Sequence, residues 1–227
     1  MKSISLWDLP TRLFHWLLVL AVTGSLVTVS LGGTWMLWHE RFGLAIVGLI
    51  SFRLVWGIVG STYARFLQFI PGPFAISAYL KGEWQGLGHN PLGALSVLAM
   101  LGLLGFQAVT GLFATDAIAF NGPLYRAVSS GWNETITSWH KLTEWFIYGL
   151  IVLHVASVLF YTLVKKDNLI APMISGRKRV GGAENKERAG GGLLAFIVAL
   201  AVAAFAVWVA SGGLLSPPPP PPPDLGW

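Results

Sequence analysis

The sequence predicts an all-α membrane protein, in which a four-helix transmembrane bundle is followed by a fifth, C-terminal transmembrane helix. First, 54% of the 227 residues are hydrophobic, only 11% are charged, and the mean hydropathy is +0.65. Soluble domains carry about 25% charged residues. Second, five stretches reach the roughly 20 apolar residues that a membrane-spanning helix needs. They are residues 13–31, 35–59, 91–114, 139–164 and 193–211.

The helix boundaries follow from local signals. The apolar run of the first stretch exceeds the 7–15 residues of a typical signal-peptide core, so we expect it to be retained as a membrane helix. Glycines inside the second and third stretches are compatible with membrane helices, because small residues let helices approach closely. Asn90 is predicted to cap the third helix, with Pro91 as its first residue.

The distribution of basic residues predicts the orientation. Twelve of the 15 Lys and Arg residues lie in the N-terminal segment, the 53–81 loop and the 165–188 loop. Because cytoplasmic loops are enriched in Lys and Arg, the N-terminus is expected in the cytoplasm. With five spans, the C-terminus is then expected on the periplasmic side of a bacterial inner membrane.

The chain is expected to divide into four parts. Residues 1–175 form the helical bundle, 176–192 a basic cytoplasmic linker, 193–213 the additional helix, and 214–227 a periplasmic tail. The tail contains seven consecutive prolines at 217–223, which predict a polyproline II spacer.

Composition excludes several kinds of site. The chain has no cysteine, which rules out disulfides, thiolate metal sites and covalently attached haem. The net charge of +5 and the pI near 9.7 could suggest nucleic acid. However, the basic residues flank the apolar stretches and therefore indicate membrane topology, so we expect no nucleic-acid partner and contact with membrane lipid.

The histidines are the strongest candidates for chemistry. All five lie in or near predicted spans, where ionisable residues are costly and usually functional. His140 and His154 are 14 residues apart, close to four helical turns, and therefore share one face of the fourth helix at two depths. The alternating topology puts His39 level with His140 on the outer side. It puts His15 opposite His154 on the inner side.

Two stacked histidine pairs favour haem over other metal centres. Zinc and copper sites usually need three or four clustered ligands, and no Glu or Asp is expected at mid-depth in any span. Haem needs only one or two axial ligands. We therefore expect two noncovalent haems b with bis-histidine ligation. Because two ligands fill both faces of each iron, such haems are suited to electron transfer.

Cationic residues at the span ends are candidates for contacts with the anionic haem propionates. Arg12 and Arg53 lie on the inner side, and Arg41 and Lys141 on the outer side. Each could instead mark topology only. His89, just before the third helix, is expected to be an interfacial residue, with hydrogen bonding to a propionate or a quinone as the alternative.

Several strings resemble one family. They are WDLPTRLFHW at 7–16, FRLVWGIVGS at 52–61, YARF at 63–66, GHNPLG at 88–93, and the helix from His140 to His154 running into KDNL at 166–169. Together they resemble the bacterial cytochrome b561 family, including the b-type cytochrome subunit of nickel–iron hydrogenases. The likeness covers about residues 3–180.

The resemblance implies a four-helix bundle with two haems b that carries electrons between a quinone or quinol and a redox partner. That partner would be a periplasmic c-type cytochrome or a hydrogenase-like protein. By position, His15, His39, His140 and His154 match the ligand pattern of the family, whereas His89 does not. The fifth helix and proline tail depart from the compact family core.

Three other functions stay open at this point. A self-sufficient oxidoreductase, for example one that oxidises superoxide and reduces quinone, would work without a partner. A transporter could use the histidines as proton relays. A scaffold without chemistry would bind no chromophore.

Overall fold

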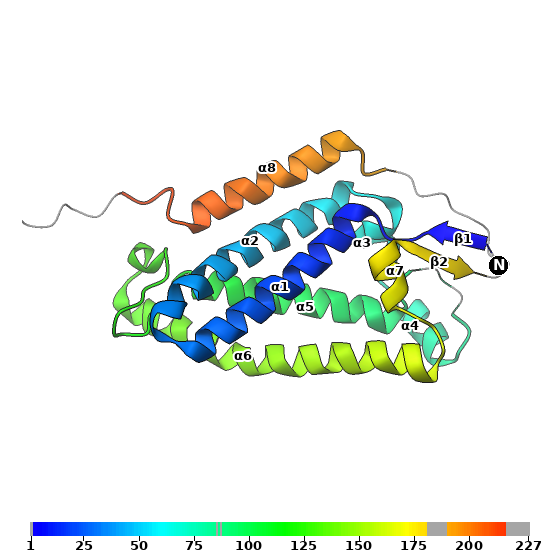
Figure 1. Cartoon of the computed structure of the whole chain (residues 1–227), viewed down its shortest axis with the longest axis horizontal. Helices are drawn as coiled ribbons and strands as arrows, with labels where there is room; N and C mark the ends of the chain where they lie inside the picture. The colour runs from blue at the N-terminus through cyan, green and yellow to red at the C-terminus, as the bar shows by residue number, and fades with distance from the viewer. Residues whose placement is uncertain (1, 85, 87, 181–189, 217–227) are drawn as a thin grey trace, which may run out of the picture.

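The computed structural model describes residues 2–84, 86, 88–180 and 190–216 of the chain. Figure 1 shows four long helices running side by side, with a fifth packed against α2. The long helices are α1 (Leu9–Leu31), α2 (Met36–Val59), α5 (Pro91–Gly111) and α6 (Ser130–Leu159), and α8 (Leu193–Ala210) is the fifth. All five are long and apolar enough to cross a membrane. The predicted fold class is confirmed.

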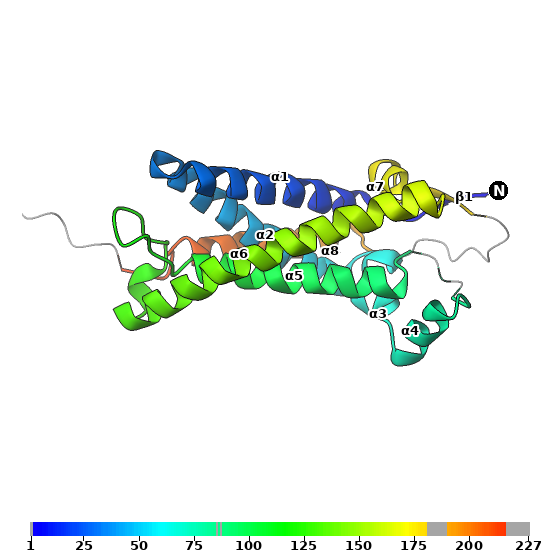
Figure 2. The ribbon, with the colours of Figure 1, turned by 90° about the horizontal axis from the view of Figure 1, so that it is seen from below.

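Short elements connect the long helices. They are the 3₁₀ turns η1 (Gly33–Trp35), η2 (Thr62–Ala64) and η3 (Tyr125–Ala127), the helices α3 (Phe66–Phe69), α4 (Pro73–Leu80) and α7 (Ile170–Ser175), and the π-helical turn η4 (Phe160–Val164) that ends α6. Figure 2 shows α4 projecting from the same end of the bundle as α7. We call this end the sheet end, and the end that carries residues 112–129 the loop end.

The sheet end takes its name from two strands, which the sequence analysis did not predict. β1 (Lys2–Ser5) pairs antiparallel with β2 (Arg177–Val180), which joins the N-terminus to the segment after α7. Strand β2 occupies the start of the predicted linker. Gly176 precedes it with a φ of +78°, and a Cβ at this position would lie 2.7 Å from the backbone oxygen of Trp7. A glycine is therefore required where these two segments meet.

Helix α1 begins four residues before the predicted start. The Asp8 side chain accepts a hydrogen bond from Thr11 N at 2.7 Å, which caps the helix, and Pro10 lies in its first turn. The predicted stretch began at Leu13 because Thr11 and Arg12 are polar. The Asp8 cap and Pro10 nevertheless start the helix before these two residues. At α5 the same kind of signal was used, and the predicted Asn90 cap is confirmed.

Helix α6 begins nine residues before the predicted start because its first turns are polar but well bonded. Asn133 Nδ2 donates to Tyr125 O at 3.2 Å, and Thr115 N donates to Thr137 Oγ1 at 3.1 Å. Both polar side chains are buried against the loop that precedes the helix. Hydropathy could not reveal these turns, because tertiary hydrogen bonds stabilise them.

Helix α8 joins the core through aromatic packing. Phe52 and Trp56 on α2 stack at 5.9 Å, and Phe196 of α8 meets both rings edge-on. Trp56 is 1% exposed. The polyproline run at 217–223 and linker residues 181–189 lie outside the described part of the chain.

Candidate functional site

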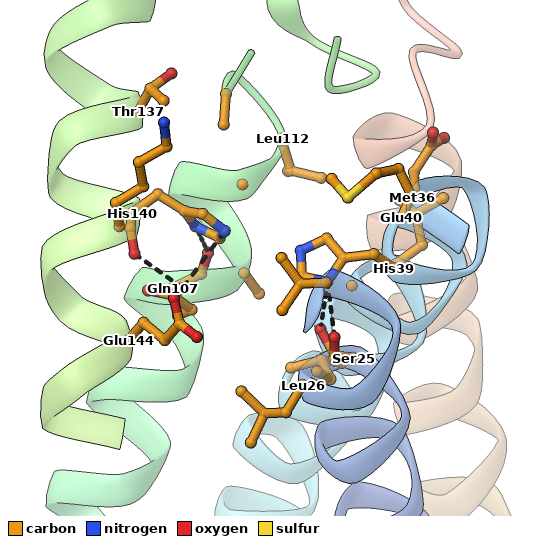
Figure 3. Close-up of a pocket in the computed structure, with 18 of the residues that line it drawn as sticks. Ser25, Leu26, Met36, His39, Glu40, Gln107, Leu112, Thr137, His140 and Glu144 are labelled. Carbon is orange, nitrogen blue, oxygen red and sulfur yellow. Dashed lines mark hydrogen bonds between the residues drawn. The ribbon is translucent and has the colours of Figure 1, made fainter. Parts of the chain in front are cut away.

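At the loop end, the structure brings together His39 of α2 and His140 of α6. Their ring centroids are 6.2 Å apart and the rings are nearly perpendicular, at 82°. Both side chains line a cavity of about 280 Å³ between α1, α2, α5 and α6. Figure 3 shows the two imidazoles facing each other across this cavity.

Backbone carbonyls of neighbouring helices fix both imidazoles. His39 Nδ1 lies 2.9 Å from Ser25 O, and His140 Nδ1 lies 3.0 Å from Gln107 O (Figure 3). Because a carbonyl can only accept, each Nδ1 carries the hydrogen and donates it. Each Nε2 is therefore unprotonated, and that of His140 lies 3.4 Å from the Gln107 amide nitrogen. Metal-binding histidines are usually oriented by this kind of bond.

Side chains from the same helices tighten the arrangement around His140. Thr110 Oγ1 lies 3.2 Å from His140 Nδ1, and the Gln107 amide donates to the backbone oxygen of His140 at 3.0 Å. The Gln107 carbonyl oxygen also accepts a hydrogen bond from Thr143. These contacts leave the imidazole little freedom to rotate.

At the sheet end, the structure brings together His15 of α1 and His154 of α6. Their ring centroids are 6.4 Å apart, at an interplanar angle of 50°. His15 Nδ1 is buried, and no described residue forms a hydrogen bond with it. The structure therefore places these two residues at matching depth, as their predicted pairing requires.

Both pairs have the spacing that one metal ion between two imidazoles requires. An imidazole nitrogen binds a metal at about 2.0 Å, so the centroids of two rings on opposite sides lie about 6.3 Å apart. The observed distances are 6.2 and 6.4 Å. The described residues contain no group of three or more His, Cys, Asp or Glu that could hold a metal. The donor sets therefore fit haem, which supplies four nitrogens of its own.

Two carboxylates lie beside the loop-end pair. Glu40, which follows His39 on α2, and Glu144, one turn after His140 on α6, both line the cavity. The Glu144 side chain accepts a hydrogen bond from Tyr148 at 3.0 Å.

The two sheet-end arginines have different environments. Arg12 Nη1 donates to the backbone oxygen of Ile174, which ties α1 to α7. Arg53 is 3% exposed, and its guanidinium lies over the Phe66 ring at 4.7 Å. At the loop end, Arg41 stacks on Trp38 at 4.8 Å. None of these contacts involves a histidine of either pair.

Sequence reasoning missed the residues that orient the paired histidines. Ser25, Gln107 and Thr110 are polar residues within apolar helices, and Gln107 and Thr110 are one turn apart on α5. That polarity was the available signal, because polar side chains in membrane helices face the bundle interior. Asp8 was also missed. Its carboxylate is 3% exposed and accepts hydrogen bonds from Trp56 Nε1 at 3.0 Å and from Ser61.

Comparisons with known proteins show similarity over most of the chain. Curated relatives include the probable Ni/Fe-hydrogenase 1 B-type cytochrome subunit of Escherichia coli (strain K12), which is 25% identical over 80% of this chain and 94% of its own length. The probable Ni/Fe-hydrogenase B-type cytochrome subunits of Rhizobium leguminosarum bv. viciae and Azotobacter vinelandii are 25% and 26% identical. They cover 78% and 77% of this chain, and 89% and 88% of their own lengths.

No solved structure matches the chain. The family profile described as prokaryotic cytochrome b561 matches residues 6–176, which include both histidine pairs. Membership of a cytochrome b family implies haem b, electron transport and a multi-pass membrane location. The chain belongs to the prokaryotic cytochrome b561 family.

Proposed function

We propose that this protein is a dihaem b-type cytochrome that carries electrons across the bacterial inner membrane. His39 and His140 would ligate one haem, and His15 and His154 the other. The single observation behind this proposal is the presence of two imidazole pairs at metal-binding distance, at two depths of one bundle. The 14 residues between the α6 ligands correspond to about 21 Å along the helix axis.

When bound, each haem would supply a one-electron carrier, held by the two imidazoles of its pair. The protein's own groups hold and orient it. Backbone carbonyls keep the ligand lone pairs of His39 and His140 directed into the cavity. The walls of the loop-end cavity are mainly apolar, which limits solvent access to a bound cofactor. Arg12 and Arg53 are the proposed sheet-end cations for the propionates.

The proposed electron partners are a quinone or quinol in the membrane and a periplasmic redox protein. The names of the relatives favour a hydrogenase as that protein. A periplasmic c-type cytochrome would satisfy the same chemistry. We further propose that the sheet end is cytoplasmic, because most Lys and Arg residues lie there.

Ligand replacement on α6 tests this proposal. His140→Leu should lose the loop-end haem and His154→Leu the sheet-end haem, so each purified variant should contain one haem per polypeptide instead of two. Trp145→Leu is a matched control, because this residue lies on the same helix and is 73% exposed. It should retain two haems. Two haems in both histidine variants would contradict the assignment.

A further inference from the structure

A buried cation at the sheet end lacks a complete set of partners. Arg53 is 3% exposed, and among the described residues its Nη1 has no hydrogen-bond partner. His89, which precedes α5, has a buried Nδ1 that is likewise unpaired within the described part of the chain. Burying a polar or charged donor without an acceptor costs several kcal/mol. The two orphaned groups therefore indicate an acceptor that is not part of the described chain.

The two groups belong to one aromatic cluster. The Arg53 guanidinium lies 4.7 Å from the Phe66 ring and 6.0 Å from the Phe69 ring. The His89 ring packs between Phe69, at 4.8 Å, and Trp7, at 4.6 Å. Phe69 is thus common to both, and the apolar rings around them leave few alternative acceptors.

The nearby carboxylate does not neutralise Arg53 by contact. Asp8 uses its oxygens to cap α1 and to accept hydrogen bonds from Trp56 and Ser61. Within the described residues, the only carboxylate–cation contact within 4 Å joins Lys178 and Asp167. Arg53 therefore keeps a positive charge that attracts an anionic oxygen more strongly than a neutral one.

His89 is suited to donate to the same oxygen. Burial and the charge of Arg53 lower the pKa of His89 to about 4, so its imidazole is neutral near pH 7. A neutral imidazole offers one N–H donor and one acceptor nitrogen. With Nδ1 protonated, the ring adds a hydrogen bond without adding a second repelling charge.

The position of Arg53 points to the source of the anion. Arg53 follows His39 on α2 by 14 residues, the same spacing that separates His154 from His140 on α6. Both intervals are close to four helical turns, so Arg53 lies at the depth of the sheet-end pair and on the face of α2 that carries His39. Arg12, the other cation at this end, already donates to Ile174 O.

We propose that Arg53 and His89 form a carboxylate-binding site that holds a propionate of the sheet-end haem. This inference rests on the proposed dihaem function. It adds His89 to the haem-binding residues. The ligand is a carboxylate, and no covalent or redox step is involved.

The test compares haem with its dimethyl ester, in which both carboxylates are neutral. The full-length chain, freed of haem, is titrated with each porphyrin in a His140→Leu background, so that only the sheet-end site binds. The unaltered site should prefer free haem by about 10- to 100-fold, as expected for a charge-assisted hydrogen bond. Arg53→Gln should abolish this preference, and His89→Phe should reduce it. Arg53→Lys should restore part of it. Arg41→Gln, at the loop end, should leave it unchanged.

Other outcomes would overturn the proposal. Equal binding of haem and its ester to the unaltered site would mean that Arg53 faces some other anion, such as a lipid phosphate. Loss of quinone binding in Arg53→Gln and His89→Phe, with haem preference and reduction potential unchanged, would assign the site to a quinone carbonyl. Failure of the dihaem assignment itself would be recognised separately, by two haems remaining in His154→Leu.

Discussion

Replacing Gly111 by alanine should selectively damage the loop-end haem site. Gly111 lies on α5 opposite His140, and a Cβ at this position would lie 2.9 Å from Cε1 of the imidazole and 3.4 Å from its Nδ1. Carbon atoms in contact prefer about 3.5–4.0 Å. The ring would therefore have to move by roughly 0.6–1 Å. The bond from His140 Nδ1 to Gln107 O, now 3.0 Å, resists this movement.

The expected magnitude follows from the cost of overpacking. Forcing an extra methyl group into a packed interior costs about 1–3 kcal/mol, which corresponds to about 5- to 140-fold weaker binding of the loop-end haem. Haem per polypeptide and a reduced-minus-oxidised spectrum measure this loss, and the sheet-end haem should be retained.

Gly102→Ala is the matched control. Gly102 lies on the same helix, and a Cβ there would meet nothing within 4 Å. This variant should keep two haems and gain slightly in helix stability, by about 0.5–1 kcal/mol. If Gly111→Ala binds two haems with an unchanged spectrum, the close approach of α5 to His140 does not control the site.

Two further predictions concern the buried polar network and helix α8. Asp8→Ala should lower the free energy of unfolding by about 3 kcal/mol, because it removes a helix cap and leaves buried donors unpaired. Asp8→Asn, which keeps one acceptor oxygen, should lose less, and equal losses in thermal unfolding in detergent would refute this explanation. Gly48→Leu should wedge α2 from α8, because a Cβ there would lie 2.8 Å from Val207 Cγ2. The temperature midpoint of unfolding of Gly48→Leu should be lower than that of the control Gly149→Leu, because a Cβ at Gly149 would meet nothing within 4 Å. Both variants should keep two haems. Loss of haem in Gly48→Leu would show that α8 supports the haem sites directly.

Sequence patterns predicted the apolar parts of the fold well. All five spans were found, because a bilayer requires about 20 apolar residues in each spanning helix. The errors lie at polar ends. The first turns of α6 carry Asn133 and Thr137, whose partners come from the preceding loop. Strand β2 forms only because β1, more than 170 residues away in sequence, supplies its hydrogen bonds.

The four paired histidines could also be identified from sequence, because an ionisable residue in a membrane helix is rare and the helical period fixes its face. The residues that orient them were missed. Ser25 and Gln107 act through backbone carbonyls, so the polarity of their side chains was only an indirect signal of this role.

The sequence by itself determined that this chain has five helices able to span a membrane and imidazoles at two depths, since hydropathy and helical periodicity are local properties. Only the tertiary structure decided that each pair meets at 6.2–6.4 Å and that Arg53 and His89 share one aromatic cluster. Those distances depend on how separate helices tilt and pack, and packing depends on contacts between residues that are far apart in the chain.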